Sequence, residues 1–202
     1  MAYVHLPPSI MRRLAARVGC RVVRVQRLGE VAPGREGIGY EIECPSHAAK
    51  AKLLDALAWY DAQNDLSLRS FALDVRRAFG GGPRDWAAVI HRLVRDTVAF
   101  QREPKETFQD SFLTLYYGAG DCDDVSRLVV ALLRILGVRA RLALLYRKGL
   151  RTSAGEDVPT HVSAQALLDG RWEWLETTLA ARFGEHPVAA KRRLDAAGRS
   201  DL

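Results

Sequence analysis

The sequence predicts a protein of the α+β class, on three observations. Hydrophobic residues recur with a helical period through residues 47–98. A further helix with one apolar face is predicted after Asp121, and strand-like runs joined by the dipeptide Asp169-Gly170 follow it. Helices and strands that are separated along the chain in this way are typical of α+β proteins.

The composition is that of a globular protein that buries a core. Hydrophobic residues make up 48% and charged residues 27% of the 202 residues. The longest unbroken apolar run covers residues 128–133, far short of the roughly 20 residues that a membrane-spanning helix needs. The N-terminus lacks the apolar stretch of a signal peptide. We therefore expect a cytoplasmic protein without a membrane partner.

The charge and the cysteines exclude several further classes. The net charge of +6 comes from 30 basic and 24 acidic residues that are spread along the chain. A nucleic-acid interface gathers basic residues on one element with aromatic support, so no nucleic-acid partner is expected. The three cysteines, Cys20, Cys44 and Cys122, contain no CxxC pair and predict neither a zinc ribbon nor a disulfide framework. Cys20 and Cys44 are expected to be small buried hydrophobic residues.

Residues 1–46 are predicted to form a small N-terminal appendage, a helix followed by a β-hairpin. The helix spans residues 9–18, with Ser9 as its cap. Two strand-like runs, 21–28 and 40–44, follow it and are joined by a long loop that contains Gly and Pro. Because so short a unit cannot build a core of its own, we expect it to pack on the residues that follow.

Residues 47–183 are predicted to form the core, whose first half is helical. Three apolar stripes define three helices, and Asp85 is expected to open the third. The stripes consist of Leu54, Leu57, Ala58 and Ala62, then Leu68, Phe71, Val75 and Phe79, then Trp86, Val89, Ile90, Leu93, Val94 and Val98. Residues 99–121 show no clear period and are predicted to be a loop. Residues 184–202 are predicted to be a polar, basic C-terminal tail.

The second half of the core is predicted to contain a helix and three strands. The apolar face of the helix consists of Val125, Leu128, Val129, Leu132, Leu133 and Leu136, and Gly137 ends it. Strands are expected over residues 138–146, 161–168 and 171–178. The polar stretch 147–159 between the first two strands is predicted to be a loop, either a cover over the site or plain surface.

The Asp-Gly turn fixes the register of the last hairpin, because Asp-Gly between strands favours a two-residue turn. The pairs it predicts are Leu168 with Arg171, Leu167 with Trp172, Gln165 with Trp174 and Ser163 with Glu176. His161 and Glu176 then share one face as diagonal neighbours, within reach of a hydrogen bond. A carboxylate on one ring nitrogen fixes the tautomer of a histidine, as a general base requires.

Cys122 lies where the central helix is predicted to begin. The positive end of the helix dipole and the free backbone N–H groups favour a thiolate and can receive an oxyanion. Three flanking acids, Asp121, Asp123 and Asp124, oppose the thiolate unless they point away or cap the helix. A cysteine alone is more often a buried hydrophobic residue, but one aligned with His161 and an acid is a candidate nucleophile.

Two blocks of sequence resemble the transglutaminase-like superfamily of papain-like thiol enzymes, in its bacterial or phage-associated form. The first is Gly-Ala-Gly-Asp-Cys-Asp-Asp-Val-Ser-Arg-Leu at 118–128, which is similar to the family's nucleophile helix. The second runs from the His161 strand through Asp169-Gly170 and Trp172 to Leu-Glu-Thr-Thr at 175–178. The order and spacing of both blocks agree with the family over residues 85–180.

The resemblance implies a fold and a set of catalytic residues. The fold is a papain-like core in which the nucleophile starts a central helix that packs on an antiparallel sheet carrying His and Glu. Cys122 is then the nucleophile, His161 the base and Glu176 the third member. The chain departs from the family at Glu176, where Asp is usual, and at Ser163, where an aromatic residue is frequent.

Further site residues and the expected ligands complete the prediction. Gln109 is a candidate oxyanion donor, because papain-like enzymes often place a glutamine upstream of the nucleophile. Trp172 and Trp174 are expected to lie in the core or to form the wall of the site. The acids around Cys122 lack calcium-loop spacing, and the chain has too few soft ligands for structural zinc, so neither a metal nor another cofactor is expected.

Two functions fit these features. In the first, Cys122 attacks an amide of a protein or peptide substrate and forms a thioester; water as acceptor gives a peptidase or amidase, an amine gives a transglutaminase, and hydrolysis is favoured. In the second, the fold is a structural or assembly module without catalysis, for example a component of a phage virion, which docks through its N-terminal unit and its tail. The protein is then expected in the bacterial cytoplasm or, in the second case, in a phage particle.

Overall fold

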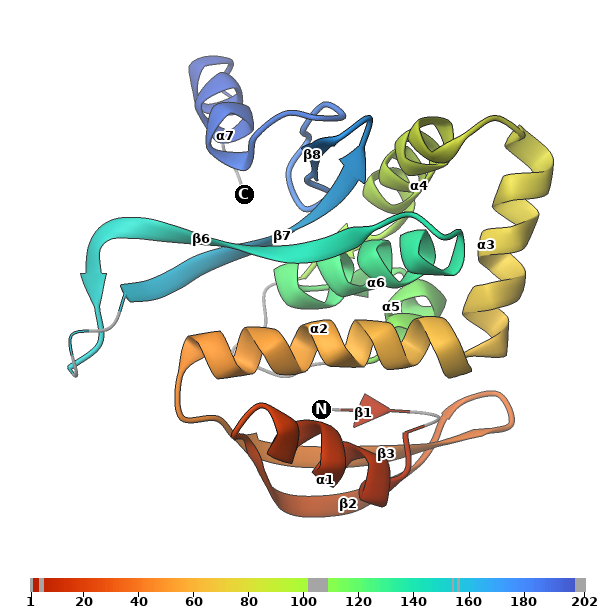
Figure 1. Cartoon of the computed structure of the whole chain (residues 1–202), viewed down its shortest axis with the longest axis vertical. Helices are drawn as coiled ribbons and strands as arrows, with labels where there is room; N and C mark the ends of the chain where they lie inside the picture. The colour runs from red at the N-terminus through yellow and green to blue at the C-terminus, as the bar shows by residue number, and fades with distance from the viewer. Residues whose placement is uncertain (1, 4–5, 102–108, 154, 156, 199–202) are drawn as a thin grey trace.

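Helix α6 (Cys122–Ile135) lies at the centre of the fold in the computed structural model of the chain (Figure 1). The structure describes residues 2–3, 6–101, 109–153, 155 and 157–198. Helices pack around α6 on several sides: α2 (His47–Asn64), α3 (Leu66–Phe79), α4 (Pro83–Thr97) and α5 (Ser111–Tyr117). An antiparallel sheet of strand order β6-β7-β8 covers another side: β6 (Ala140–Arg151), β7 (Asp157–Leu168) and β8 (Arg171–Leu175). The α+β class predicted from the sequence is confirmed.

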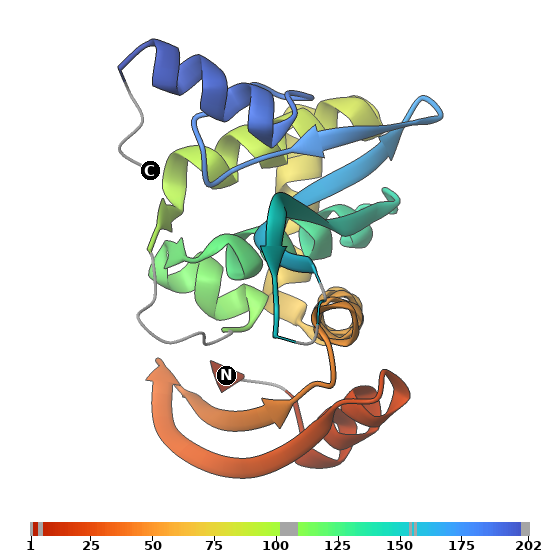
Figure 2. The same ribbon diagram turned by 90° about the vertical axis from the view of Figure 1, so that its left-hand side faces the viewer.

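The N-terminal unit shares a core with α2. It consists of β1 (Ala2–Tyr3), α1 (Pro8–Arg17), β2 (Arg21–Ala32) and β3 (Arg35–Glu43), with the sheet order β1-β3-β2. Met11 and Tyr40 of this unit and Leu53 and Leu57 of α2 are buried in one hydrophobic cluster. Figure 2 shows the unit as a curved layer beside α2, which is seen end-on. The unit therefore packs on the residues that follow it, as expected.

Two local predictions for the N-terminal unit are wrong. Helix α1 begins at Pro8 with Pro7 as its cap residue, and Ser9 lies inside the helix. Proline suits the first turn of a helix because its φ is already helical and its missing N–H is not needed there. The hairpin has no long loop, because β2 and β3 continue to a turn at residues 33–34, in which Gly34 has a φ of 69°.

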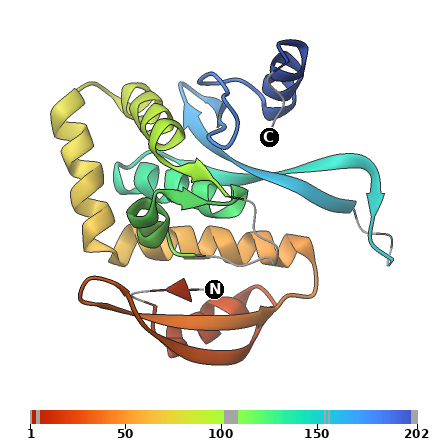
Figure 3. The ribbon, with the colours of Figure 1, turned by 180° about the vertical axis from the view of Figure 1, so that it is seen from behind.

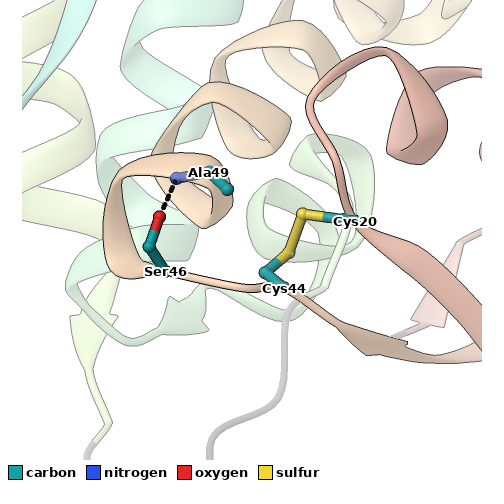
Figure 4. Close-up of a disulfide and its surroundings, with 4 residues drawn as sticks. All are labelled: Cys20, Cys44, Ser46 and Ala49. Atoms are coloured by element: carbon teal, nitrogen blue, oxygen red, sulfur yellow. Dashed lines mark hydrogen bonds between the residues drawn. A yellow bond between two sulfur atoms is a disulfide. The ribbon is translucent and has the colours of Figure 1, made fainter. Parts of the chain in front are cut away.

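The structure joins Cys20 and Cys44 in a disulfide (Figure 4), so the prediction that both are simple buried hydrophobic residues is wrong. The reason is the register of the sheet. Arg21 pairs with Glu43 at the end of the antiparallel ladder, which brings the two flanking cysteines opposite each other. Ser46, two residues after Cys44, accepts a hydrogen bond from the backbone N–H of Ala49 and caps α2.

Removing the disulfide is expected to lower the free energy of unfolding by about 3 kcal/mol, because a link of this sequence separation restricts the unfolded chain. The measurement is urea unfolding of a Cys20→Ser, Cys44→Ser double variant against the parent, both carrying Cys122→Ala to prevent thiol exchange. Adding dithiothreitol to the parent should reproduce the loss, whereas it should not affect the double variant. Equal midpoints for the two proteins would contradict the prediction.

Helix α6 is buried on more sides than its apolar face predicts. The predicted core positions Val125, Leu128, Val129, Leu132 and Leu133 are all buried, and Val130 and Ala131 are buried as well. The sequence shows only one stripe, whereas the helix contacts both the sheet and the surrounding helices. It is therefore a rigid support for the residue at its first position.

The last hairpin has the predicted register. Asp169 and Gly170 form the turn with φ values of 51° and 78°, the left-handed region that Gly readily adopts. Leu168 pairs with Arg171, Leu167 with Trp172 and Gln165 with Trp174. The strand is shorter than predicted, because β8 ends at Leu175 and the expected pair of Ser163 with Glu176 lies beyond the ladder. The preceding hairpin is longer than predicted, because β6 and β7 extend through Arg151 and Asp157 and form an arm that projects from the molecule (Figures 1 and 3). Most of the predicted loop at 147–159 is thus strand.

The stretch predicted as a loop at 99–121 contains α5 between two short strands, β4 (Ala99–Phe100) and β5 (Ala119–Gly120), which pair in parallel (Figure 3). Helix α5 has 7 residues, too few for an apolar period to be recognised. Its ends follow ordinary rules, because the Asp110 side chain accepts from Leu113 N–H and Gly118 ends the helix with a φ of 62°.

The C-terminal segment contains helix α7 (Pro187–Ala196), which lies beyond β8 in Figure 1. Ala190 and Leu194 on α7 are buried, so this part of the predicted tail is packed on the protein. Within the described residues, none of the helices combines the length and the apolar character that crossing a membrane requires.

Candidate active site

Cys122 is the first residue of α6, and its neighbours hold the helix start in place. The carboxylate of Asp121 accepts hydrogen bonds from the N–H groups of Asp123 (2.9 Å) and Asp124 (3.1 Å). Gly120 lies so close to Asp124 that a Cβ at residue 120 would be 2.8 Å from the Asp124 Cβ, so a larger residue would displace this turn. The thiol is free and half-buried.

The start of α6 is docked on β7 next to His161. Ser126 Oγ donates a hydrogen bond to the carbonyl oxygen of Val162 at 3.1 Å. The backbone of Val162 also lies close enough to the sulfur of Cys122 to influence its pKa. Because Val162 directly follows His161 in β7, these contacts bring the thiol to the part of the strand that carries the imidazole.

His161 is hydrogen-bonded to Glu176, the pair that the hairpin register predicts. His161 Nε2 lies 2.6 Å from Glu176 Oε2, and the Glu176 side chain is only 1% exposed. The other carboxylate oxygen, Oε1, accepts from the N–H and Oγ1 of Thr178 and from the N–H of Leu179. Burial alone raises the pKa of Glu176, but the hydrogen bonds and charge of His161 and the bonds from Thr178 outweigh it, and the pKa is lowered. Glu176 is therefore an ionised acceptor.

This arrangement fixes the tautomer of His161. A carboxylate can only accept, so Nε2 carries the proton in the bond to Glu176. The other nitrogen, Nδ1, is then the one that can accept a proton in the neutral ring. The side chain of His161 is 22% exposed, so its ring borders solvent.

The three acids around Cys122 differ in orientation. Asp121 caps the helix, and Asp124 points inward, where its carboxylate accepts from the N–H of Gln109 at 2.9 Å. Burial and the charge of Asp121 raise the pKa of Asp124 to about 8. Asp123 is different, because its Oδ1 lies 3.6 Å from the sulfur of Cys122.

The resting thiol is held in its protonated form. Burial and the charge of Asp123, with Asp121 adding to them, raise the pKa of Cys122 to about 12, although the Val162 N–H opposes the shift. The expectation that the helix N-terminus favours a thiolate is therefore outweighed here.

Gln109 lies at the start of α6, as a candidate oxyanion donor should. Its side-chain Nε2 donates to the carbonyl oxygen of Ala119 at 2.5 Å. The backbone carbonyl oxygen of Gln109 accepts a hydrogen bond from Arg127 Nη1 at 3.1 Å. Together with the bond from its N–H to Asp124, these contacts fix the residue. In this structure its amide is directed to the backbone of β5, so its role as oxyanion donor stays a prediction.

The two tryptophans of β8 make ring contacts with residues outside the Cys122 group. The guanidinium of Arg141 lies 4.0 Å from the ring centre of Trp172, and the rings of Trp174 and His186 are 4.6 Å apart. Arg141 also donates to Gln165, which shows that these residues share the face that the register predicts. A role of the tryptophans as site wall stays a prediction.

Sequence reasoning missed two sets of supporting residues. His91 of α4, which carried no partner pattern, is buried, and its Nε2 lies 2.8 Å from the carbonyl oxygen of Glu176. Arg127 of α6 and Asp61 of α2 form a buried ion pair, and Ser111 Oγ donates to the same Asp61 oxygen. The sequence indicates a buried role for Arg127 only through its position inside the apolar pattern of residues 125–136. No local signal identified its partner.

Three potential metal ligands lie close together in the described part of the chain. They are Asp121, Cys122 and Asp123, whose ligand atoms lie within 4.8 Å of one another. Two of them are already engaged, because Asp121 caps the helix and Asp123 is paired with Lys50 at 3.6 Å. The donor set suits capping and an ion pair.

Comparison with known proteins identifies a family and a fold. The family model of the transglutaminase-like superfamily matches residues 77–177, and no curated protein matches the sequence. Among solved structures, a putative protease from Parabacteroides distasonis has 13% identity and a TM-score of 0.50, over 81% of this chain and 38% of that chain. A putative cysteine protease from Cytophaga hutchinsonii has 14% identity and a TM-score of 0.46, over 79% and 66%. A TGase has 12% identity and a TM-score of 0.42, over 94% and 53%.

The likeness to the Parabacteroides protein agrees with the architecture described above. The chain spans 38% of the length of the Parabacteroides protein, and at 13% identity the likeness concerns the fold alone. The family match is of greater weight, because it covers half of the chain and includes Cys122, His161 and Glu176. The chain therefore belongs to the transglutaminase-like superfamily, and its core has the papain-like α+β fold.

Proposed function

We propose that the protein is a papain-like thiol enzyme that cleaves or transfers the acyl group of a protein or peptide amide. Cys122 is the nucleophile, His161 the base and Glu176 the group that orients it. The observation that carries the proposal is the 2.6 Å bond from His161 to a buried Glu176, on the strand that also contacts the thiol. A cysteine that served only to fill space would need no such pair.

The first half of the reaction forms a thioester. Nδ1 of His161 takes the proton from Sγ as the sulfur attacks the carbonyl carbon of the amide, and the carbonyl oxygen becomes an oxyanion. The N–H of Cys122, at the first position of α6, has no acceptor within the helix and is aimed outward from its start, as an oxyanion donor must be. When the C–N bond breaks, the amine leaves with the proton from His161, and the acyl group stays on sulfur.

The second half consumes the thioester. A water or an amine loses a proton to His161 as it attacks the thioester carbon. When the C–S bond breaks, His161 gives this proton to sulfur and Cys122 is a thiol again. We favour water as the acceptor, because the partly exposed ring of His161 gives solvent access to the base. A closed site that excluded water would favour an amine.

An activated ester tests the proposal without knowledge of the natural substrate. p-Nitrophenyl acetate should acylate Cys122 and release p-nitrophenolate at a rate that falls about 10²–10⁴-fold in His161→Ala, the range for loss of a general base. Peptide mass spectrometry should find the acetyl group on Cys122, and Cys122→Ala should show no burst. An unchanged rate in His161→Ala would remove the basis of the proposal.

The same acyl-enzyme identifies the acceptor. With cadaverine present, hydrolysis predicts that acetate remains the main product, whereas transglutamination predicts N-acetylcadaverine. The Cys122→Ala protein, incubated in parallel, corrects for the uncatalysed reaction of ester with amine.

A further inference from the structure

We propose that Asp123, held in place by Lys50, restrains the nucleophile: it binds the Cys122 thiol in its resting form and thereby sets the threshold for reaction. Asp123 is a positioning residue, since it acts on the reacting atom through Cys122. The inference concerns thiol reactivity, and only its meaning for catalysis rests on the proposed function.

The geometry links three residues from two helices. Cys122 Sγ lies 3.6 Å from Asp123 Oδ1, within the range of a weak S–H bond to a carboxylate. The other oxygen, Oδ2, lies 3.6 Å from Nζ of Lys50 on α2. The side chain of Asp123 is 8% exposed and that of Lys50 is 21% exposed, so water screens the carboxylate little. The carboxylate thus connects an ammonium on one side to the thiol on the other.

The other charged groups around the sulfur have separate tasks. Asp121 uses its carboxylate to cap α6, and Asp124 binds the N–H of Gln109 away from the thiol. His161 on β7 is hydrogen-bonded to the carboxylate of Glu176, which directly follows β8. In the described part of the chain, the carboxylate of Asp123 is thus the one with a hydrogen bond from the sulfur.

The direction of the effect follows from charge. A negative group beside a thiol disfavours the thiolate, and a hydrogen bond from S–H to that group stabilises the protonated form further. The pKa of Cys122 is raised in agreement with this, burial being the largest cause and Asp123 the next. Attack on a substrate must break the S–H contact with Asp123 before the proton can pass to His161.

A simpler explanation of Asp123 makes a different prediction. Acidic residues are common in the first turn of a helix because they interact favourably with its dipole. If this were its only role, removing the charge would lower the melting temperature of the protein slightly and would leave the reactivity of Cys122 unchanged. Stability and thiol reactivity are therefore measured on the same variants.

The test is the rate of iodoacetamide alkylation at Cys122, followed by peptide mass spectrometry as a function of pH. Asp123→Asn should react at least about tenfold faster than the parent near neutral pH, equivalent to one pKa unit, with a profile moved to lower pH. Asp121→Asn is the matched control, because it removes the same charge while its amide oxygen can still cap the helix. It should give a clearly smaller acceleration.

Defined outcomes overturn the inference. Equal rates for Asp123→Asn and the parent, or equal accelerations by Asp123→Asn and Asp121→Asn, would show that contact with Asp123 does not control the thiol. Asp123→Ser, which also suits a helix start, replaces Asp123→Asn if that protein does not fold.

Failure of the proposed function is distinguishable from failure of this inference. Measured in a His161→Ala background, the acceleration by Asp123→Asn should persist, because it depends on the carboxylate and the sulfur alone. If it persists while the ester acylation shows no dependence on His161, Asp123 controls the thiol and the catalytic proposal is wrong. If ester acylation depends on His161 but Asp123→Asn has the parent's alkylation rate, the catalytic proposal stands and the inference is wrong.

Discussion

An Arg127→Ala variant is expected to lose about 3–5 kcal/mol of unfolding free energy, the range for breaking a buried ion pair by removing one partner. Arg127 is 1% exposed, and its Nη2 and Nε lie 2.6 and 3.0 Å from Asp61 Oδ2. Without the guanidinium, the Asp61 carboxylate stays buried with Ser111 as its remaining described donor. Urea unfolding followed by circular dichroism measures the loss.

A double variant separates the destabilisation caused by an unpaired buried carboxylate from the contribution of the ion pair to stability. Arg127→Leu with Asp61→Leu removes both charges, so it should recover most of the stability that Arg127→Ala loses, because no unpaired ion remains. The four-member cycle with each single leucine variant gives the coupling energy. A loss below about 1 kcal/mol in Arg127→Ala, the level of an exposed pair, would contradict the buried geometry.

Glu176→Gln is expected to reduce His161-dependent acylation by about 10⁴-fold, the effect of the comparable acid-to-amide change in a serine protease triad. The physical reason lies in the environment of Oε1, which accepts from Thr178 and Leu179. These donors hold the single amide oxygen of glutamine, so the NH₂ group faces His161. The ring must then carry its proton on Nδ1, which leaves no acceptor for the thiol proton.

The p-nitrophenyl acetate burst measures this loss, and Glu176→Asp serves as the matched variant. Aspartate keeps the charge but has a shorter reach, so its rate should lie between those of the parent and Glu176→Gln. A melting temperature close to that of the parent should show that Glu176→Gln keeps its fold. A Glu176→Gln rate within about tenfold of the parent would mean that Glu176 does not set the tautomer.

The sequence sufficed wherever a local rule determines a long-range contact. The Asp169-Gly170 turn is such a case, because a two-residue turn sets every later pair of the hairpin. The hydrogen bond of His161 to Glu176 follows from this register. The start of α6 at Cys122 was likewise readable, since Asp121 is a strong capping residue directly before an apolar period.

Other features depend on contacts between distant segments. The Cys20–Cys44 disulfide depends on the register of β2 and β3, in which Arg21 pairs with Glu43, and the long loop expected between the two runs left this register open. The partner of Arg127 lies 66 residues away on another helix, and its identity is a result of packing. The orientations of the three acids around Cys122 depend on side-chain rotamers and on Lys50, which no spacing rule specifies.

The chain contains two cysteines that are oxidised and one that is not, and the burial of Cys122 together with its contact with Asp123 explains how both states can exist together. Peroxide and disulfides react with thiolates far more readily than with thiols. Cys122 is half-buried and held as S–H against a carboxylate, so it is a poor target for both. Oxidising conditions that join Cys20 to Cys44 should therefore leave Cys122 reduced. Asp123, which lowers the reactivity of this thiol, then also protects it from oxidation.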